Sequence, residues 1–390
     1  MHRFYFSLIL RKMAKTKKKP GPVMLAKPHK FTKRYSLADV LLRKEKKFLY
    51  FIAFSLIAAG VLYPYPSIAM WVGFAFAGYS AIANDSIQTI GTFIGSNEDK
   101  KWYWQWLFMG LIFVFTVTYS WIVFEGDVSY QRLATPGLDK TPTNFVYLQL
   151  ASPIILLLLT RFRIPVSTTF MLLSVFTATS GTILSMINKS IAGYFVAFFS
   201  ALVIYLILTK VIKRFIKGEA HVSWTVAQWV ISGFLWYTWL AQDLANIAVY
   251  LPRQLNIYEF LVFTGFIFFG LGFLFYKKGD KIQNIINEKS EVRDVRSATI
   301  IDLVYAIILY FFKEVNNIPM STTWVFVGLL AGRELGMRLR AHDSSVKFAK
   351  TFNLIGKDIL SVAIGLIISI ILAVAINPVI QQELINFFFE

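Results

Sequence analysis

Two short polar motifs each occur twice in this chain, in the same order and inside or beside strongly apolar segments. The first copies read ANDSIQ at 83–88 and IPVSTT at 164–169, and the second copies read AQDLAN at 241–246 and IPMSTT at 318–323. The copies lie about 155 residues apart, the length of a membrane-sized structural repeat. Polar motifs duplicated within two apolar repeats predict one central site between the repeats.

The composition indicates a membrane protein. Of the 390 residues, 56% are hydrophobic, and the mean hydropathy of +0.57 lies far above that of soluble domains. Many segments reach the roughly 20 apolar residues that cross a bilayer. The absence of cysteine excludes disulfides and thiolate chemistry. The formal net charge of +18 gathers in the N-terminal arm and in connections, which favours orientation in a membrane over nucleic-acid binding.

We predict an all-α polytopic membrane protein of about 11 membrane elements. The positive-inside rule places the N-terminus in the cytoplasm and the C-terminus outside, in a bacterial inner membrane. Met13 is an alternative start to Met1. The predicted parts are a basic cytoplasmic N-terminal arm at 1–46, an extra first transmembrane helix at 47–67, repeat unit 1 at 68–212, a cytoplasmic linker at 213–223, repeat unit 2 at 224–376 and a C-terminal tail at 377–390.

The two repeat units are expected to cross the membrane in opposite directions. Each unit contains five predicted elements, and because five is odd the second unit begins on the side opposite to the first. Asp85 then lies on an element that runs inward, and Asp243 lies on one that runs outward. The count of elements and the charge pattern therefore predict an inverted-topology repeat.

Two predicted elements are short and lead directly into the IPxSTT motifs. The segment 145–160 contains Pro153, and its counterpart at 303–312 is shorter still. Proline cannot donate a backbone hydrogen bond and disfavours helix at the preceding residue, so each motif should interrupt a helix. We expect re-entrant helical hairpins with tips near the bilayer midplane. Two ordinary crossings joined by a tight turn give the same sidedness and are the alternative.

The hydroxyl groups after each proline are candidate anion ligands. A helix start offers free backbone N–H groups and the positive end of the helix dipole, and hydroxyls add neutral donors. Two such starts that face each other could surround a tetrahedral oxyanion, whereas the plainer interpretation is that Ser and Thr only cap the helices. The candidate substrate-binding residues are Ser167, Thr168, Thr169, Ser321, Thr322 and Thr323.

The acidic motifs are candidate cation sites. A carboxylate inside the bilayer costs about 2.5–3.5 kcal/mol even on a lenient scale, so it needs a partner. Carboxylate and amide oxygens together form the hard shell that suits a small cation such as Na⁺. A helix-capping aspartate and a proton-carrying aspartate are the alternatives. The candidate cation-binding residues are Asn84, Asp85, Gln88, Gln242, Asp243 and Asn246.

Electrostatics favours the entry of cations together with an anion. An inside-negative potential opposes each entering negative charge by about 2.3 kcal/mol per 100 mV. Two cations would cancel the charge of a divalent oxyanion, and a third would let the field drive uptake. Arg161 and Arg163 precede the first IPxSTT motif and are candidate anion-steering residues. Interfacial anchoring is their plainer interpretation.

The four motifs resemble those of the PiT family of inorganic phosphate transporters. That family carries two Gly-Ala-Asn-Asp-x-x-Asn and two Pro-x-Ser-Thr-Thr-His motifs in an inverted repeat, and the resemblance covers roughly residues 68–376. The resemblance implies that Asp85, Asp243 and the neighbouring amides help to hold the coupling cations, while the six hydroxyl residues contact phosphate. It also implies a homodimer.

The chain departs from the family motifs in both copies, which indicates a divergent branch. The longer glutamine side chain moves an amide oxygen by one methylene, and aromatic rings in place of histidine leave a drier site with two fewer titratable groups. The departures are Ile82 and Leu240 at the glycine, Gln88 and Gln242 at an asparagine, and Phe170 and Trp324 at the histidine.

We therefore expect a secondary active transporter that imports inorganic phosphate by symport with Na⁺ or H⁺ and uses no cofactor. The alternatives are a permease of the same fold for sulfate or another oxyanion, and a non-transporting membrane sensor or assembly protein. An enzyme is not expected, because the sequence shows no nucleophile–base set, phosphate loop or dinucleotide motif. The expected partners are phosphate, the coupling cation, the lipid bilayer and a second copy of the chain, without nucleic acid.

Overall fold

The computed structural model describes residues 45–84, 86–161, 164, 166–177, 179–215, 219–277, 294–315, 319–340 and 348–389. The chain divides into two compact units, Met1–Tyr50 and Phe51–Glu390. In the first unit the described residues form only the beginning of helix α3 (Lys46–Leu62). The predicted N-terminal arm therefore lies almost entirely outside the described residues, and everything that follows concerns the second unit.

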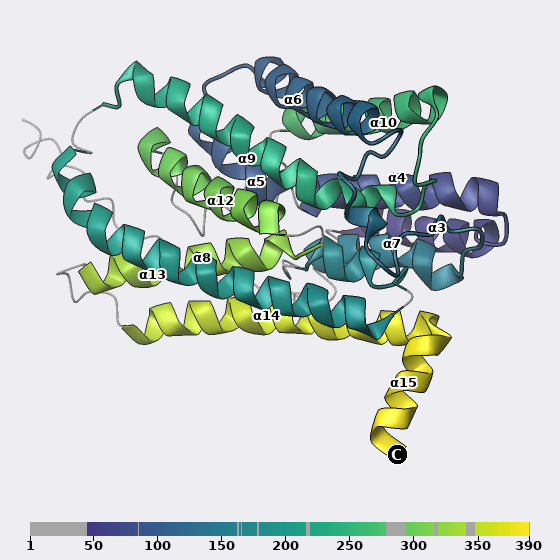
Figure 1. The fold of residues 1–390 in the computed structure, drawn as a ribbon. Helices are drawn as coiled ribbons and strands as arrows, with labels where there is room; N and C mark the ends of the chain where they lie inside the picture. Colours follow the sequence, from purple (N-terminus) through teal and green to yellow (C-terminus); the bar gives the residue numbers. More distant parts are fainter. Residues whose placement is uncertain are drawn as a thin grey trace, which may run out of the picture. The chain divides into compact units, whose positions relative to one another are not determined.

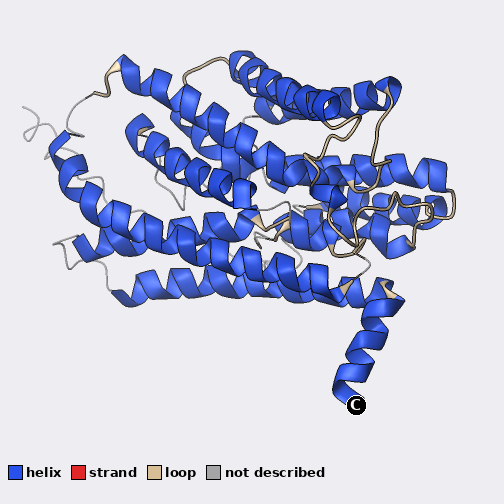
Figure 2. Cartoon of the chain, viewed as in Figure 1, coloured by secondary structure: helices blue, strands red, loops and turns tan. Residues whose placement is uncertain are grey.

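The all-α prediction is confirmed, because the described part of the chain contains helices and no strand (Figure 1, Figure 2). Six of the described helices have stretches long and apolar enough to cross a membrane, namely those in α4, α6, α8, α10, α12 and α14. The chain is thus a polytopic membrane protein by length and composition. The helices are α4 (Pro66–Asn84), α5 (Ser86–Ser96), α6 (Trp102–Val123), α7 (Tyr147–Arg161), α8 (Ser180–Phe215), α9 (Val222–Ala248), α10 (Ile257–Tyr276), α12 (Val295–Val315), α13 (Thr322–Arg340), α14 (Phe348–Ile376) and α15 (Pro378–Phe389).

The structure corrects the predicted boundaries after the first IPxSTT motif. A short π-helix, η2 (Thr169–Leu173), follows the motif, and α8 then runs uninterrupted through residues 187–190, where the sequence predicts a gap between two elements. Ser190 does not break the helix, because its hydroxyl donates to the Met186 carbonyl oxygen of the same helix (2.7 Å). The predicted gap is therefore wrong, and the real interruption lies between η2 and Ser180.

Helix α12 is longer than its prediction. The sequence predicts an element near 298–312 with an apolar part of only 303–312, whereas α12 continues for 21 residues and is long and apolar enough to cross a membrane. The polar residue Asp302 lies within this helix because hydroxyls of Thr92 and Ser232 hydrogen-bond its carboxylate. Helix α7 is short, with 15 residues including Pro153. The choice between re-entrant hairpins and ordinary crossings stays a prediction.

Glycines allow α13 to pack backbone to backbone against α8, and the two helices run side by side in Figure 1. Residues Gly328, Gly332 and Gly336 recur at intervals of four and so share one face of α13. A Cβ atom at Gly332 would lie 2.0 Å from the Phe198 carbonyl oxygen, and one at Gly328 only 2.3 Å from the Tyr194 carbonyl oxygen. In membranes, small residues of this kind let two helix backbones approach closely, and the resulting van der Waals contacts stabilise the helix pair.

The α8–α13 contact predicts a position-specific effect of one methyl group. We expect Gly332→Ala to lower the free energy of unfolding by about 1–3 kcal/mol, because two helix backbones must move apart. Gly265→Ala on α10 is the matched control, since a Cβ atom there meets nothing within 4 Å. Thermal unfolding of both variants in the same detergent measures the difference. Equal melting temperatures for the two variants would contradict the close packing.

Candidate ion and substrate site

The two IPxSTT motifs contact each other through a reciprocal pair of hydrogen bonds. The hydroxyl of Thr169 donates to the carbonyl oxygen of Met320 (3.0 Å), and the hydroxyl of Thr323 donates to the carbonyl oxygen of Val166 (3.4 Å). Thr169 and Thr323 occupy the same position of the motif, as do Val166 and Met320. Thr169 and Thr323, which are 154 positions apart (323 − 169), thus make the same contact, each with the motif of the other.

The acidic motifs contact the same threonines in a second reciprocal pair. The amide nitrogen of Gln88 donates to the Thr323 hydroxyl (3.2 Å), and that of Asn246 donates to the Thr169 hydroxyl (3.3 Å). Gln88 and Asn246 also share one motif position. A contact repeated with the partners exchanged is what a two-fold axis produces, and these two reciprocal pairs have that pattern. The inversion of the repeats across the membrane stays a prediction.

The hydroxyl residues are buried but do not all act alike. The hydroxyls of Ser167 and Ser321 accept from the backbone N–H groups of Phe170 and Trp324, both at 3.2 Å, which is the capping role. Thr168 accepts from Asn246 (3.2 Å). The Thr322 hydroxyl is 1% exposed and lies beside the Asp243 carboxylate, but no hydrogen bond of ordinary geometry uses it among the described residues. Capping and anion binding are therefore compatible here, since each motif contributes several hydroxyls.

Asp243 lies on α9 at the centre of this cluster and is 1% exposed. Its Oδ1 atom accepts from the amide of Asn246 (2.6 Å) and lies 3.3 Å from the Thr169 hydroxyl, whose single proton is shared with the Met320 carbonyl oxygen. Buried oxygens without a hydrogen-bond partner are rare, and carboxylate and amide oxygens are the ligands that hard cations use. Across the described residues, four such oxygens belong to the acidic motifs: Gln88 Oε1, Gln242 Oε1, Asp243 Oδ2 and Asn246 Oδ1.

The first acidic motif ties α4 to the IPxSTT region. Asn84 donates to the carbonyl oxygen of Val166 (3.0 Å) and accepts from the hydroxyl of Thr160 (3.0 Å). Gln242, at the matching position, donates to a carbonyl of α12 (3.3 Å). Asp85 lies outside the described residues, so its predicted cation-binding role stays a prediction. Asn84 and Gln242 thus use their amide nitrogens to position the motifs.

The two aromatic residues that follow the IPxSTT motifs meet at the site. The rings of Phe170 and Trp324 pack edge to face with centroids 6.0 Å apart. The indole N–H of Trp324 is buried and has no hydrogen-bond partner among the described residues. It is an unused donor at the Phe170–Trp324 ring contact, whereas the sequence interpretation assigned these rings only a drying effect. Of the predicted steering residues, Arg161 ends α7, and Arg163 lies outside the described residues.

Sequence reasoning missed a second buried carboxylate, Asp302 of α12, which is 1% exposed. It accepts hydrogen bonds from the hydroxyls of Thr92 and Ser232 (2.5 Å each) and from the amide of Gln228 (3.3 Å). These partners come from α5 and α9, so the carboxylate joins three helices. The cost of an acidic residue inside an apolar segment was the available signal. Asp302 belongs to neither copy of the duplicated motifs, so the motif pattern does not mark it.

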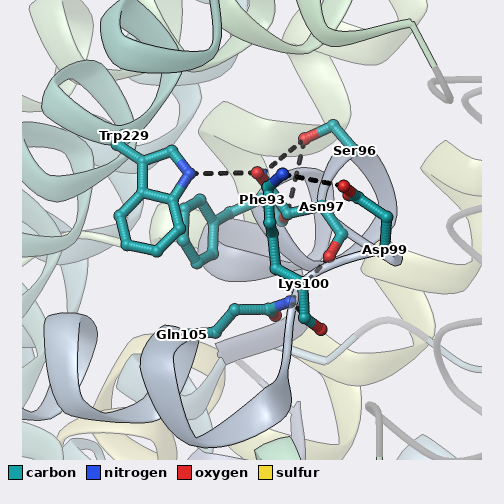
Figure 3. Close-up of polar contacts among 7 residues, drawn as sticks. All are labelled: Phe93, Ser96, Asn97, Asp99, Lys100, Gln105 and Trp229. Atoms are coloured by element: carbon teal, nitrogen blue, oxygen red, sulfur yellow. Dashed lines mark hydrogen bonds and ion pairs between the residues drawn. The ribbon is translucent and has the colours of Figure 1, made fainter.

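The Asp302 network extends to the turn between α5 and α6, drawn in Figure 3. Ser96 donates to the Gln228 amide oxygen (3.0 Å), which links the turn to the network. The side chain of Asn97 accepts from the indole N–H of Trp229 (3.0 Å), and its backbone carbonyl accepts from the amide of Gln105 (2.7 Å). The start of α6 is therefore held against α9 by side chains.

Comparisons with known proteins give one structural likeness to report. No protein-family model matches the sequence, and no curated protein matches it. A solved structure titled "The sodium-dependent phosphate transporter" is similar with a TM-score of 0.48 and 17% sequence identity, over 85% of this chain and 99% of that chain.

The reciprocal bonds predict matching effects of two substitutions. We expect Thr169→Val and Thr323→Val to lower the free energy of unfolding by comparable amounts, about 0.5–1.5 kcal/mol, because each removes a buried hydroxyl that hydrogen-bonds the other motif. Thr238→Val is the control, since the Thr238 hydroxyl bonds only carbonyls of its own helix (2.9 and 3.1 Å). Thermal unfolding in detergent measures all three. Clearly unequal losses at residues 169 and 323 would argue against the pseudo-two-fold arrangement.

Proposed function

We propose that this chain imports inorganic phosphate across a membrane by symport with Na⁺ or H⁺. One buried cluster brings together acidic and hydroxyl motifs from both halves of the chain, and this arrangement carries the proposal. The cluster contains unused acceptors, such as Asp243 Oδ2, and unused donors, namely the Thr322 hydroxyl and the Trp324 indole N–H. Acceptors of this kind suit a cation, and donors suit an oxyanion.

Cation and anion would each make the binding of the other more favourable. A buried carboxylate is costly in a membrane protein, so a cation at Asp243 lowers the free energy of the site. An anion next to an uncompensated carboxylate would be repelled, whereas a cation between them attracts both. The gain is reciprocal by linkage, so phosphate binding also raises cation affinity. This mutual stabilisation is the physical basis of symport.

The pseudo-two-fold contacts support transport by alternating access. Because the two halves hold the cluster through equivalent contacts, an exchange of their conformations would open the same site to the opposite side. The reciprocal hydrogen bonds that join the halves are few, and each contributes about 1 kcal/mol net.

Phosphate is favoured over sulfate by the unused amide oxygens of the cluster. Gln88, Gln242 and Asn246 each present a buried amide oxygen without a hydrogen-bond partner among the described residues. Monohydrogen phosphate carries a proton that it can donate to such an oxygen, whereas sulfate is fully deprotonated and has none. An acceptor that faces sulfate would therefore stay unsatisfied, which is the costly case.

The uptake of radiolabelled phosphate into proteoliposomes tests the proposed function. We expect uptake to require an inward Na⁺ gradient and to be lost in Asp243→Asn, which removes the buried charge that the cation compensates. Asp99→Asn is the control, because Asp99 is an exposed residue paired with Lys100 (2.8 Å). Asp302→Asn in the same assay reports whether the second buried carboxylate also takes part in coupling.

The outcomes separate the alternatives. Uptake driven only by a proton gradient would reassign Asp243 to proton coupling while keeping the substrate. Uptake of sulfate but not of phosphate would show that the substrate is a different oxyanion, while the chain would still be a transporter. No flux of either anion under either gradient would favour a membrane sensor or assembly protein.

The two unused donors predict which substitutions weaken phosphate binding. We expect Thr322→Val and Trp324→Phe to raise the KM for phosphate about tenfold each. A hydrogen bond to a charged group contributes about 1.5–3 kcal/mol, and about 1.4 kcal/mol corresponds to a tenfold change in affinity. Thr168→Val is expected to raise the KM as well. Trp229→Phe is the control, because the Trp229 indole already donates to Asn97. An unchanged KM in Thr322→Val and Trp324→Phe would remove these donors from the anion site.

A further inference from the structure

Two buried carboxylates, those of Asp243 and Asp302, differ in how their oxygens are used. Both oxygens of Asp302 accept hydrogen bonds, Oδ1 from the Thr92 hydroxyl and Oδ2 from the Ser232 hydroxyl and the Gln228 amide. On Asp243, by contrast, no hydrogen bond of ordinary geometry uses Oδ2 among the described residues. Asp243 therefore has an oxygen to offer to a cation, whereas the oxygens of Asp302 are already occupied by donors of the protein.

The hydrogen bonds to Asp302 have the lengths expected for an ionised carboxylate. The hydroxyls of Thr92 and Ser232 each lie 2.5 Å from their acceptor, in the short range of charge-assisted O–H···O⁻ bonds. A charge that is 1% exposed is costly unless donors surround it. The donors come from α5 and α9, while Asp302 belongs to α12, so they offset this cost only while the three helices stay in contact.

The helices that Asp302 joins also carry the candidate cation ligands. On α5, Thr92 follows Gln88 by four residues, so the two side chains share one face of the helix. On α9, Ser232 lies on the same helix as Asp243. The amide oxygen of Gln88 and Oδ2 of Asp243 are both buried and unused. The distance between α5 and α9 at Asp302 therefore influences the distance between these two oxygens.

Helix α12 contacts both second-copy motifs within about two turns of Asp302. The hydroxyl of Tyr305 donates to the backbone carbonyl of Thr322 (3.0 Å). The backbone carbonyl of Leu309 accepts from the amide of Gln242 (3.3 Å). A displacement of α12 at Asp302 would therefore be transmitted to the IPMSTT motif and to the AQDLAN motif. The Asp302 network thus fixes three helices whose other contacts form the cluster.

We propose that Asp302 is a positioning residue for the coupling cation. Its charge holds α5 and α12 against α9, and so keeps Gln88, Gln242 and Asp243 at the separation that a cation requires, without binding the cation itself. Groups that lie outside the ligand shell commonly set the geometry, and hence the affinity, of a metal site. This inference rests on the proposed symport and adds a division of roles, in which Asp243 binds the cation and Asp302 positions its ligands.

Cation binding to the purified full-length protein tests the positioning role. The thermal stability of the wild type, Asp302→Asn and Thr92→Val is titrated with NaCl against choline chloride. We expect both variants to bind Na⁺ about tenfold more weakly, the lower end of the effect of groups that orient metal ligands. Thr92→Ser keeps the hydroxyl that donates to Asp302, so it should bind Na⁺ as tightly as the wild type does.

Asp127→Asn is the matched control. The carboxylate of Asp127 also accepts three hydrogen bonds, from the backbone N–H and the hydroxyl of Ser129 (2.7 and 2.6 Å) and from the backbone N–H of Gln131 (2.6 Å). These partners lie in the connection between α6 and α7, and none of the three bonds involves α5, α9 or α12. Asp127→Asn should therefore leave the Na⁺ affinity unchanged, even if the protein becomes less stable.

The number of bound cations separates positioning from direct binding. Equilibrium dialysis with radiolabelled Na⁺ at saturation counts the cations that each chain binds. We expect Asp302→Asn to bind as many cations as the wild type, because the ligands are intact and only their separation is less well fixed. A variant that binds one cation fewer at saturation would make Asp302 itself a cation ligand, and this result would overturn the inference.

Unchanged Na⁺ affinity in Asp302→Asn and Thr92→Val would also overturn the inference, because Asp302 would then contribute to stability alone. An equal loss of affinity in Asp127→Asn would do the same, since any loss of stability would then weaken binding. If Asp302→Asn does not fold, the comparison of Thr92→Val with Thr92→Ser decides the matter.

The inference and the proposed function can fail separately. A wild-type protein that Na⁺ does not stabilise would overturn the inference, whereas phosphate uptake driven by a proton gradient would leave the proposed function standing. Conversely, the expected Na⁺ affinities in a protein that transports no phosphate would overturn the proposed function and leave the positioning role of Asp302 supported.

Discussion

A helix that breaks inside a membrane protein leaves backbone groups that no water can satisfy, and this constraint organises the site. Each broken IPxSTT segment here supplies the missing partner of the other. Thr169 donates to the carbonyl of Met320, and Thr323 donates to that of Val166. The two breaks therefore contact each other directly. The amides of Gln88 and Asn246 join the same threonines and bring the acidic motifs to the breaks.

Satisfying the backbone leaves an excess of polar atoms, and that excess is the source of the proposed function. The buried cluster keeps acceptors on Gln88, Gln242, Asp243 and Asn246 and donors on Thr322 and Trp324 that no described residue uses. A structure built only for stability would not retain both kinds, because each unsatisfied group costs about 1–3 kcal/mol. A cation and an oxyanion bound together would satisfy both sets.

The second half is not a copy of the first, and the differences carry much of the chemistry. Asp302, in the second half of the chain, has hydroxyl partners on α5 and α9. Arg132 lies in the α6–α7 connection and contacts α9 through Ala241. The ring pair Phe170 and Trp324 differs between the copies in offering an indole donor on one side. A symmetric frame thus holds an asymmetric set of charges and donors.

The sequence by itself determined the all-α membrane class and the six hydroxyl and six acidic-motif candidates, because apolar length and duplicated motifs are properties of local sequence. It also located the motif breaks, since proline acts on its own neighbours. Only the tertiary structure decided that α8 continues through Ser190, that Ser167 and Ser321 cap while Thr169 and Thr323 bridge, and that Asp302 and Arg132 are buried. Each of these features depends on a contact with a residue that only the folded chain brings near. Arg132 and Ala241 are 109 residues apart, and no local pattern records that they meet.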